Sequence, residues 1–349
     1  MERRTFLKTI GTVAGSYALG GGLSSKVQAA ALAEEHLGVP QRILGRTGAR
    51  ISVVGFPGLA LANYDQEQGT AGLHKAFDQG INYFDVAPAY GRDGDAEIKM
   101  GIGLQGIDRS RIFLACKTKM RDKGGAREEL ERSLKRLKTD YFDLYQMHAI
   151  FTEEEVKQAL GPGGAIETFL KAKEEGKVRH FGFSAHTTAG AVAALNGFAF
   201  DSVMFPLSFV DYIETGFGKT VIELANEKGA GVIAIKALSK GAWPQGVERT
   251  RKWWYRTTET QKEVDLAVRF SLSLPGVVSA IPPSWLDLLD KAIDAGQSLR
   301  PITEAETLEL RTMAKDCQPL FREEQQRAAM GCGIYPDCPH NPDPAVRIA

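Results

Sequence analysis

Four side chains that can carry or polarise a proton lie where short apolar runs of the sequence end. Asp85 ends INYFD, Lys117 ends RIFLACK and His148 ends YFDLYQMH, while Tyr90 follows Asp85 by five residues in GINYFDVAPAYG. A lysine ammonium about 4 Å from a phenol favours the phenolate by up to ~4 kcal/mol, or roughly three pKa units downward. Burial opposes that shift, so we expect a smaller net lowering of the Tyr90 pKa.

These residue types fit the reduction of a carbonyl group, in which carbon receives a hydride and oxygen receives a proton. Asp85 would keep Lys117 charged and in place, and His148 would form a hydrogen bond with the substrate oxygen. Tyr90 would release its proton as that oxygen gains charge. Protein side chains do not supply a hydride, so the set implies a nicotinamide cofactor.

Each of the four residues also has an ordinary structural explanation. Asp85 could cap a loop, Tyr90 could pack at a rim, Lys117 could be solvated, and His148 could be a satisfied core histidine. Four such residues at equivalent strand ends nevertheless favour a functional site, because a buried lysine or aspartate is costly unless it is paired.

The apolar runs are predicted strands, and they alternate with segments of helical period such as 126–137, 216–229 and 260–272. This alternation favours a closed (β/α)8 TIM barrel, a single domain over residues 41–315, rather than an open doubly wound sheet. A G-x-G-x-x-G turn after the first strand would have indicated the open sheet, and the sequence has none there. In such a barrel the carboxyl ends of all strands meet at one face, where the four side chains would converge. The predicted strands are 51–56, 81–85, 111–117, 141–148, 178–184, 202–206, 231–238 and 276–281.

Two segments flank this pattern. Residues 41–55 contain two short runs around Arg46–Ala49 and are expected to form a hairpin that plugs the bottom of the barrel. Residues 316–349 form a tail rich in proline and cysteine. Its cysteines, Cys317, Cys332 and Cys338, lack the close C-x-x-C-x-x-C spacing of a [4Fe–4S] site, so we expect free thiols or one disulfide rather than a cluster.

The overall composition indicates a globular protein with a small or neutral partner. Lysine plus arginine equals aspartate plus glutamate at 43 each, so the formal net charge is zero and no charge block would attract nucleic acid. Hydrophobic residues make up 43% of the 349 positions, enough for one large core. Four cysteines are too few for a disulfide scaffold. The oligomeric state does not follow from the sequence.

The first 33 residues are of a different kind. Arg3 and Arg4, followed by the run FLK, resemble a twin-arginine export signal, with Glu2 in place of the usual serine or threonine. Small residues at 27–31 supply a candidate cleavage site. The alternative is an uncleaved arm or a weak membrane anchor, although the apolar segment is too short and too rich in glycine to span a bilayer stably. The pattern therefore predicts that the folded chain is periplasmic or otherwise exported through the twin-arginine route.

Several stretches carry a family resemblance. The runs GINYFDVAPAYG, IFLACKTK, SLKRLKTDYFDLYQMH, KVRHFGFSAH and GVIAIKALSKG occur in the order typical of the aldo-keto reductases, which the chain resembles over about residues 41–295. The resemblance implies a TIM barrel and NADPH-dependent reduction of aldehydes or ketones. It also implies a catalytic tetrad made of Asp85, Tyr90, Lys117 and His148.

The cofactor motifs match the family less well. Ser184 is followed by Ala185 and His186 where members commonly have Ser-Asn, Met204 replaces a common glutamine, and Ile235 replaces a stacking aromatic residue. No arginine closely follows the last predicted strand to take a 2′-phosphate, so NADPH is preferred while NADH stays possible. The expected cofactor contacts are Ser184, Lys236, Leu238 and Ser284.

Two other functions compete with carbonyl reduction. A nicotinamide-binding regulatory or structural subunit could use the same barrel, but it would have no need of a tuned acid. A lyase or isomerase without nicotinamide would predict a phosphate or metal site, and we see no histidine and carboxylate ligands at metal spacing. The aromatic run in KWWYR, residues 252–256, with Trp243 nearby, could either wall a substrate pocket or pack on the barrel rim.

Overall fold

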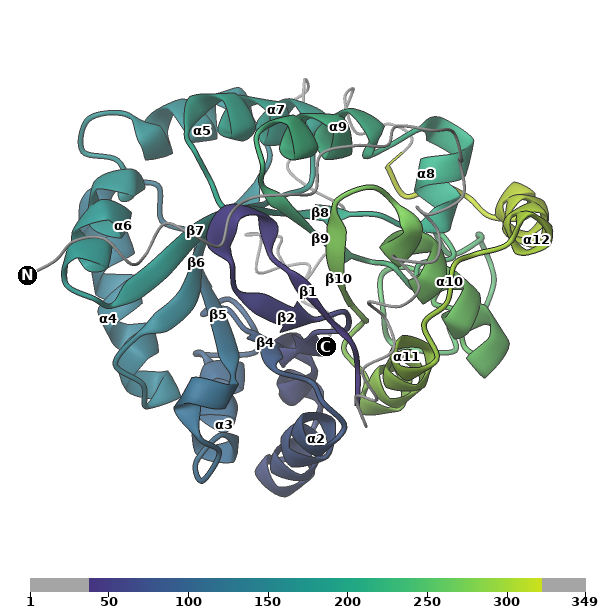
Figure 1. Cartoon of the computed structure of the whole chain (residues 1–349), viewed down its shortest axis with the longest axis horizontal. Coiled ribbons are helices and arrows are strands. Elements are labelled where there is room, and N and C mark those ends of the chain that lie inside the picture. Colours follow the sequence, from purple (N-terminus) through teal and green to yellow (C-terminus); the bar gives the residue numbers. More distant parts are fainter. Residues whose placement is uncertain (1–37, 322–349) are drawn as a thin grey trace, which may run out of the picture. The chain divides into compact units, whose positions relative to one another are not determined.

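Eight parallel strands form the centre of the computed structural model, which describes residues 38–321 (Figure 1). Each strand pairs with the next along the chain, and the bridge between Val54 and Ala280 brings the first and last together. Two backbone hydrogen bonds support that closure, Gly55 N–H to Ala280 O at 3.0 Å and Ala280 N–H to Val53 O at 2.9 Å. The predicted single-domain (β/α)8 barrel is confirmed. Its strands are β3 (Phe56–Pro57), β4 (Tyr83–Asp85), β5 (Phe113–Thr118), β6 (Phe142–Ile150), β7 (Val178–Ala185), β8 (Ser202–Pro206), β9 (Gly231–Ile235) and β10 (Val277–Ile281).

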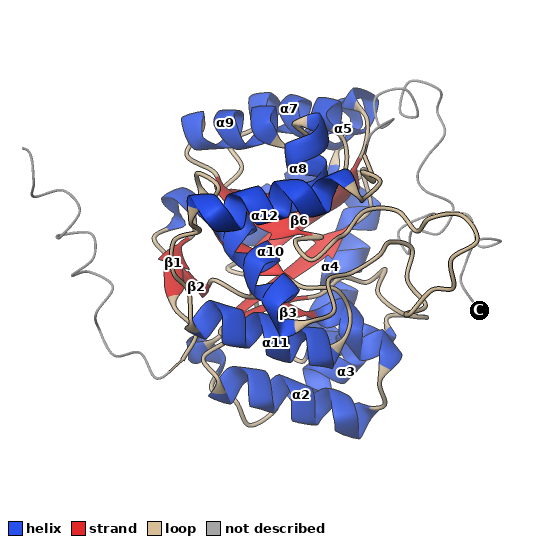
Figure 2. Cartoon of the chain, turned by 90° about the vertical axis from the view of Figure 1, so that its right-hand side faces the viewer, coloured by secondary structure: helices blue, strands red, loops and turns tan. Residues whose placement is uncertain are grey.

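Helices form the outer layer around these strands, as the side view in Figure 2 shows. Helix α4 illustrates why they lie there, because Leu130, Leu134 and Leu137 recur at helical spacing and are all buried. Within the described residues no helix is long and apolar enough to cross a membrane. The helices are α2 (Gln66–Asp78), α3 (Asp95–Gly103), α4 (Lys123–Leu137), α5 (Glu153–Leu160), α6 (Ala165–Glu174), α7 (Thr188–Gly197), α8 (Phe209–Thr215), α9 (Lys219–Glu227), α10 (Gln261–Ser273), α11 (Leu286–Gln297) and α12 (Glu304–Lys315), with short 3-10 helices η1 (Gly45–Thr47), η2 (Gly58–Asn63) and η3 (Arg109–Arg111).

The expected hairpin is present and consists of β1 (Gln41–Ile43) and β2 (Arg50–Ser52), paired antiparallel. Leu44 and Ile51 are fully buried in a cluster with inward-facing barrel residues such as Tyr83 and Leu144, so the hairpin fills the barrel interior from one end. The predicted strand 51–56 is therefore wrong as one element. Ile51 belongs to this plug, whereas Val53 and Val54 pack in the outer core, and the chain must turn between them before β3 begins.

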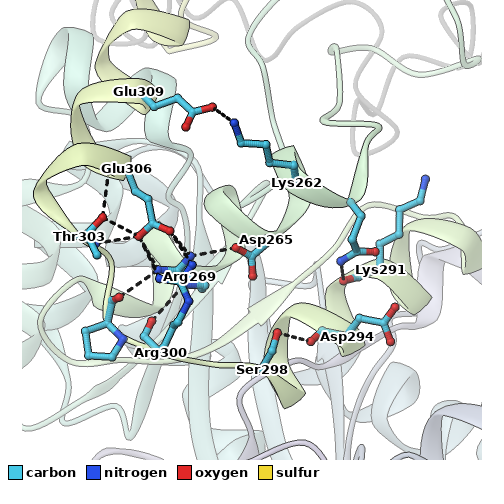
Figure 3. Close-up of polar contacts among 12 residues, drawn as sticks. Lys262, Asp265, Arg269, Lys291, Asp294, Ser298, Arg300, Thr303, Glu306 and Glu309 are labelled. Carbon is cyan, nitrogen blue, oxygen red and sulfur yellow. Dashed lines mark hydrogen bonds and ion pairs between the residues drawn. The ribbon is translucent and has the colours of Figure 1, made fainter.

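A buried arginine fastens the last helix to the barrel (Figure 3). Arg269 on α10 contacts Asp265 Oδ2 through Nη1 at 2.9 Å and Glu306 Oε2 through Nη2 at 2.7 Å. Glu306 also closes a capping box with Thr303 at the start of α12. Beyond α12 the chain lies against the segment that follows β9, because the N–H of Ala242 donates to Gln318 O at 2.7 Å.

Candidate active site

A buried lysine joins two of the predicted site residues. Strands β4 and β5 run side by side with Asp85 opposite Ala115, which places Asp85 and Lys117 near the same strand ends. Lys117 Nζ donates to Asp85 Oδ2, to Tyr90 OH at 3.2 Å and to Val86 O at 3.3 Å. Lys117 is 0% exposed and Asp85 is 2% exposed, so this ion pair is almost completely buried. Asp85 and Tyr90, predicted from one segment of the sequence, thus both meet the ammonium of Lys117, predicted from the next.

The second carboxylate oxygen of Asp85 faces two groups that sequence reasoning missed. Tyr83 OH and Gln146 Nε2 each lie 3.4 Å from Asp85 Oδ1. Strand alternation could have indicated Tyr83, because residues two apart on a strand point to the same face. Burial acts to lower the pKa of the Lys117 ammonium, but the Asp85 carboxylate and the Tyr90 phenol outweigh it and raise this pKa above its usual value. Lys117 is consequently a cation at neutral pH.

Tyr90 lies in the loop between β4 and α3 and is 8% exposed. Its ring meets the His148 ring edge-on, with centroids 5.6 Å apart and an interplanar angle of 83°. Burial raises the pKa of Tyr90 to about 12, although Lys117 acts in the opposite direction. The expected net lowering of this pKa is therefore wrong, because loss of water around the phenol outweighs the attraction of one ammonium. The phenol is fully protonated at neutral pH and is available as a proton donor.

His148 ends the regular part of β6, and its side chain lines the same pocket as Tyr90. The main chain beyond it is irregular: Ala149 has a φ of 56°, and its N–H donates to Ser184 Oγ at 2.7 Å. The structure thus brings all four predicted catalytic residues together. Tyr90, His148 and Asp85 line the pocket, and Lys117 lies behind Asp85 and Tyr90.

Three of the four expected cofactor contacts line this pocket, namely Ser184, Lys236 and Ser284. Lys236 has a φ of 58°, and its Nζ lies 3.3 Å from His186 Nδ1. Leu238 does not line the pocket; it is fully buried in the outer core. From the sequence His186 is only a departure from the Ser-Asn pattern, and its place two residues after Ser184 is the signal that could have indicated it.

The aromatic run after β9 forms part of the pocket wall. Trp253, Trp254 and Tyr255 all line the pocket, and we call these three residues the aromatic wall. Trp254 and Tyr255 meet edge-on with centroids 4.8 Å apart, and Trp243 Nε1 donates to Trp253 O at 2.8 Å. Of the two possibilities that the sequence left open, the structure supports the pocket wall. Further lining residues that sequence reasoning did not assign are Pro57, Gly58, Leu59, Ile281, Pro282 and Pro283.

Some predicted features lie outside the described residues. The export signal at 1–33 and the cysteines Cys332 and Cys338 belong to the parts of the chain for which no structure is described. Cys317, in contrast, lies among the described residues as a half-buried free thiol, and its Sγ lies 3.2 Å from Met313 O. Among residues 38–321 no group of three or more histidine, cysteine, aspartate or glutamate side chains could hold a metal ion.

Comparison with known protein families agrees with this geometry. A family model described as the aldo/keto reductase family matches residues 54–284. An uncharacterized oxidoreductase of Bacillus subtilis is 34% identical over 157 residues, which are 42% of this chain and 48% of the relative. L-galactose dehydrogenase of Arabidopsis thaliana is 29% identical over 217 residues, 57% of this chain and 66% of the relative. The matches thus span about half to two thirds of these curated relatives.

A relative named as a channel subunit is also among the matches. A putative voltage-gated potassium channel subunit beta of Schizosaccharomyces pombe is 32% identical over 162 residues, 42% of this chain and 45% of the relative. Among solved structures, the holo form of an aldo-keto reductase from Bacillus halodurans has a TM-score of 0.65 at 24% identity, covering 82% of this chain and 99% of that one. An aldo-keto reductase from Klebsiella pneumoniae in complex with NADPH has a TM-score of 0.61 at 20% identity, covering 82% and 97%. At these identities the structural matches establish the fold.

Proposed function

The chain belongs to the aldo/keto reductase family, and we propose that it reduces an aldehyde or ketone to an alcohol with NADPH or NADH. The observation that carries this proposal is the placement of one buried ammonium, Lys117, within hydrogen-bonding distance of both Asp85 and Tyr90. Tyr90 and His148 face the same pocket, so a carbonyl oxygen between them would meet a proton donor and a second polar group.

The polar groups of the pocket fit a nicotinamide dinucleotide. The Ser184 hydroxyl suits a carboxamide, the Lys236 ammonium suits a phosphate, and Ser284 lies just before the N-terminus of α11, where a phosphate would meet the positive end of the helix. When bound, the cofactor supplies the hydride that adds to the carbonyl carbon. NADPH is the preferred form in this proposal, with NADH as the second.

The residues of the chain handle the proton. Tyr90 holds its proton at neutral pH because burial keeps its pKa near 12. As the substrate oxygen gains negative charge, the phenol donates to it, and the Lys117 ammonium at 3.2 Å stabilises the phenolate that results. Asp85 holds the ammonium in place, and the aromatic wall limits access of water to the reacting oxygen.

Turnover separates this proposal from the alternative of a nicotinamide-binding regulatory subunit, for which the match to a putative potassium channel subunit is the supporting observation. Purified protein is mixed with NADPH and an activated aromatic aldehyde, and the loss of NADPH absorbance is followed. We expect turnover with the wild type, and unchanged NADPH binding with turnover slower by roughly 10²-fold or more for Tyr90→Phe. Binding of NADPH by the wild type without any turnover, across aldehydes and ketones, would favour the regulatory subunit.

We further propose that residues 1–33 direct export through the twin-arginine route, and that the mature protein is periplasmic. The motive is the pair Arg3 and Arg4 followed by FLK. A reporter fused to this segment should reach the periplasm, and replacement of both arginines by lysine should retain it in the cytoplasm. Unchanged export of the lysine variant would refute the proposal.

A further inference from the structure

The backbone just after His148 departs from regular strand geometry. Strands β6 and β7 pair in register up to Met147, and the register shifts between Met147 and Ile150. Within that shift Ala149 adopts a left-handed φ of 56°. A residue other than glycine in this conformation costs conformational free energy, so the surrounding structure must hold it there. Irregularities of this kind redirect a side chain, and here the side chain concerned is His148, at the carboxyl end of β6.

Arg121, in the loop between β5 and α4, makes the contacts that hold this irregularity. Its Nη2 donates to His148 O at 2.8 Å and to Ala149 O at 3.2 Å, and its Nη1 donates to Lys119 O at 3.1 Å. Consecutive carbonyls of a regular strand point in opposite directions, so one guanidinium nitrogen meets two of them only where the strand is distorted. The contact therefore selects the distorted backbone over the regular one.

The neighbouring groups fix the same segment from two other sides. Glu155 Oε1 lies 3.4 Å from Arg121 Nη2, while its Oε2 accepts from Phe151 N–H at 2.6 Å and from Thr152 N–H at 3.1 Å. From the opposite side, Ser184 Oγ accepts from Ala149 N–H. Arg121 itself is 9% exposed and is not among the residues that line the pocket, so it reaches the site only through the main chain.

We propose that Arg121 is a positioning residue for the reduction, and that its guanidinium sets the direction of the His148 imidazole through the carbonyls of His148 and Ala149. This inference rests on the proposed carbonyl reduction. It predicts that loss of Arg121 misdirects His148 while leaving the Lys117–Asp85–Tyr90 contacts in place.

Arg109 provides a matched control at the opposite end of the same strands. Its guanidinium also donates to two carbonyls, Ile112 O at 3.1 Å and Tyr141 O at 2.8 Å, and it forms an ion pair with Asp143 at 2.8 Å. Arg109 is not among the pocket-lining residues, and Ile112 has an ordinary extended φ of −116°. Arg109→Met thus removes a comparable set of carbonyl contacts without touching the distorted segment.

The experiment compares Arg121→Met with Arg109→Met in the full chain. Both variants should melt at a lower temperature, but only Arg121→Met should lower kcat, by about tenfold or more, with a change in NADPH Kd below about threefold. The NMR signals of the His148 imidazole, assigned with His148→Gln among the six histidines, should move only in Arg121→Met. Adding Ala149→Gly to Arg121→Met should restore part of kcat, since glycine adopts the left-handed conformation without the guanidinium.

The outcomes separate the possible failures. Equal melting-temperature losses with no change in kcat or in the His148 signals would overturn the inference, since Arg121 would then be merely structural. A loss confined to NADPH affinity would also overturn it. If the wild type reduced no carbonyl, the proposed function would fail, while the His148 signals would still test the positioning. Should Arg121→Met not fold, Arg121→Lys serves instead, because one ammonium lacks the fork that spans several carbonyls.

Discussion

Replacing Tyr90 by phenylalanine removes one hydroxyl group and keeps the other contacts of the ring and of its neighbours. The ring can keep its edge-on contact with His148 and its place 4.9 Å from Lys117 Nζ. Lys117 loses one hydrogen-bond partner but retains Asp85 and Val86 O. We therefore expect Tyr90→Phe to fold and to bind the cofactor as the wild type does.

The expected loss is that of a general acid. With a pKa of about 12, only ~10⁻⁵ of the wild-type phenol is ionised at pH 7, so almost every molecule carries the proton that the variant lacks. Loss of a positioned acid costs roughly 10²- to 10⁴-fold in rate, which corresponds to about 2.7–5.5 kcal/mol in activation free energy. Because the wild type is fully protonated, the whole of this difference should be visible at neutral pH.

The assay follows NADPH absorbance with an activated aromatic aldehyde, and tryptophan fluorescence reports cofactor binding because Trp253 and Trp254 line the pocket. Tyr145→Phe is the matched control, since Tyr145 is a fully buried phenol that is not among the pocket-lining residues. We expect the control to retain kcat. If Tyr90→Phe reduced the aldehyde at the wild-type rate with unchanged NADPH affinity, Tyr90 would not be the acid.

Four further predictions concern the buried ion pair, the Tyr90 phenol, the aromatic wall and the attachment of α12. Lys117→Met should destabilise the fold by about 3–5 kcal/mol in urea titrations because Asp85 is left buried without a counter-charge, and adding Asp85→Asn should recover most of the loss. The pKa of Tyr90 in the folded state, about 12, exceeds its ordinary value of 10.0. The contribution of the protonated phenol to the free energy of unfolding is therefore complete below pH 10 and is lost as the pH rises towards 12, which should lower the free energy of unfolding by about 2.7 kcal/mol. Trp254→Ala should raise the substrate KM roughly tenfold with a smaller change in kcat in steady-state assays. Arg269→Met should lower the melting temperature by roughly 5 °C with kcat unchanged, because Arg269 fastens α12 and is not among the pocket-lining residues.

The site residues that could be predicted from the sequence are those whose location depends only on their position at the end of a single strand. Asp85, Lys117 and His148 each end an apolar run, and in a parallel barrel the strand ends share a face whatever the details of packing. Tyr90 follows Asp85 by only five residues, so it must lie at the same end of the barrel. Topology alone therefore brings these residues together.

The features that sequence analysis missed depend on contacts between distant segments. The strand expected at 51–56 is divided because Ile51 packs inside the barrel and Val54 outside it, which a run of apolar letters does not distinguish. Arg121 stands in a polar stretch that reads as an ordinary loop, and its role depends on the carbonyls of His148 and Ala149, 27 and 28 residues further along. Leu238 continued an apolar run but packs in the outer core.

The Tyr90 pKa shows why the identity of a catalytic group is easier to predict than its acidity. Identity follows from type and position, whereas acidity is a small difference between two large effects, the desolvation of the phenolate and its attraction to Lys117. At 3.2 Å and an effective dielectric of 20 the attraction is about 5 kcal/mol, yet burial still leaves the pKa near 12. This does not weaken the proposed acid. An alkoxide formed on the substrate is far more basic than a phenolate of pKa about 12, so proton transfer to it stays downhill, and the high pKa ensures that the proton is present when the oxygen needs it. The ammonium is thus required less to ionise Tyr90 in the resting protein than to stabilise the phenolate once its proton has left.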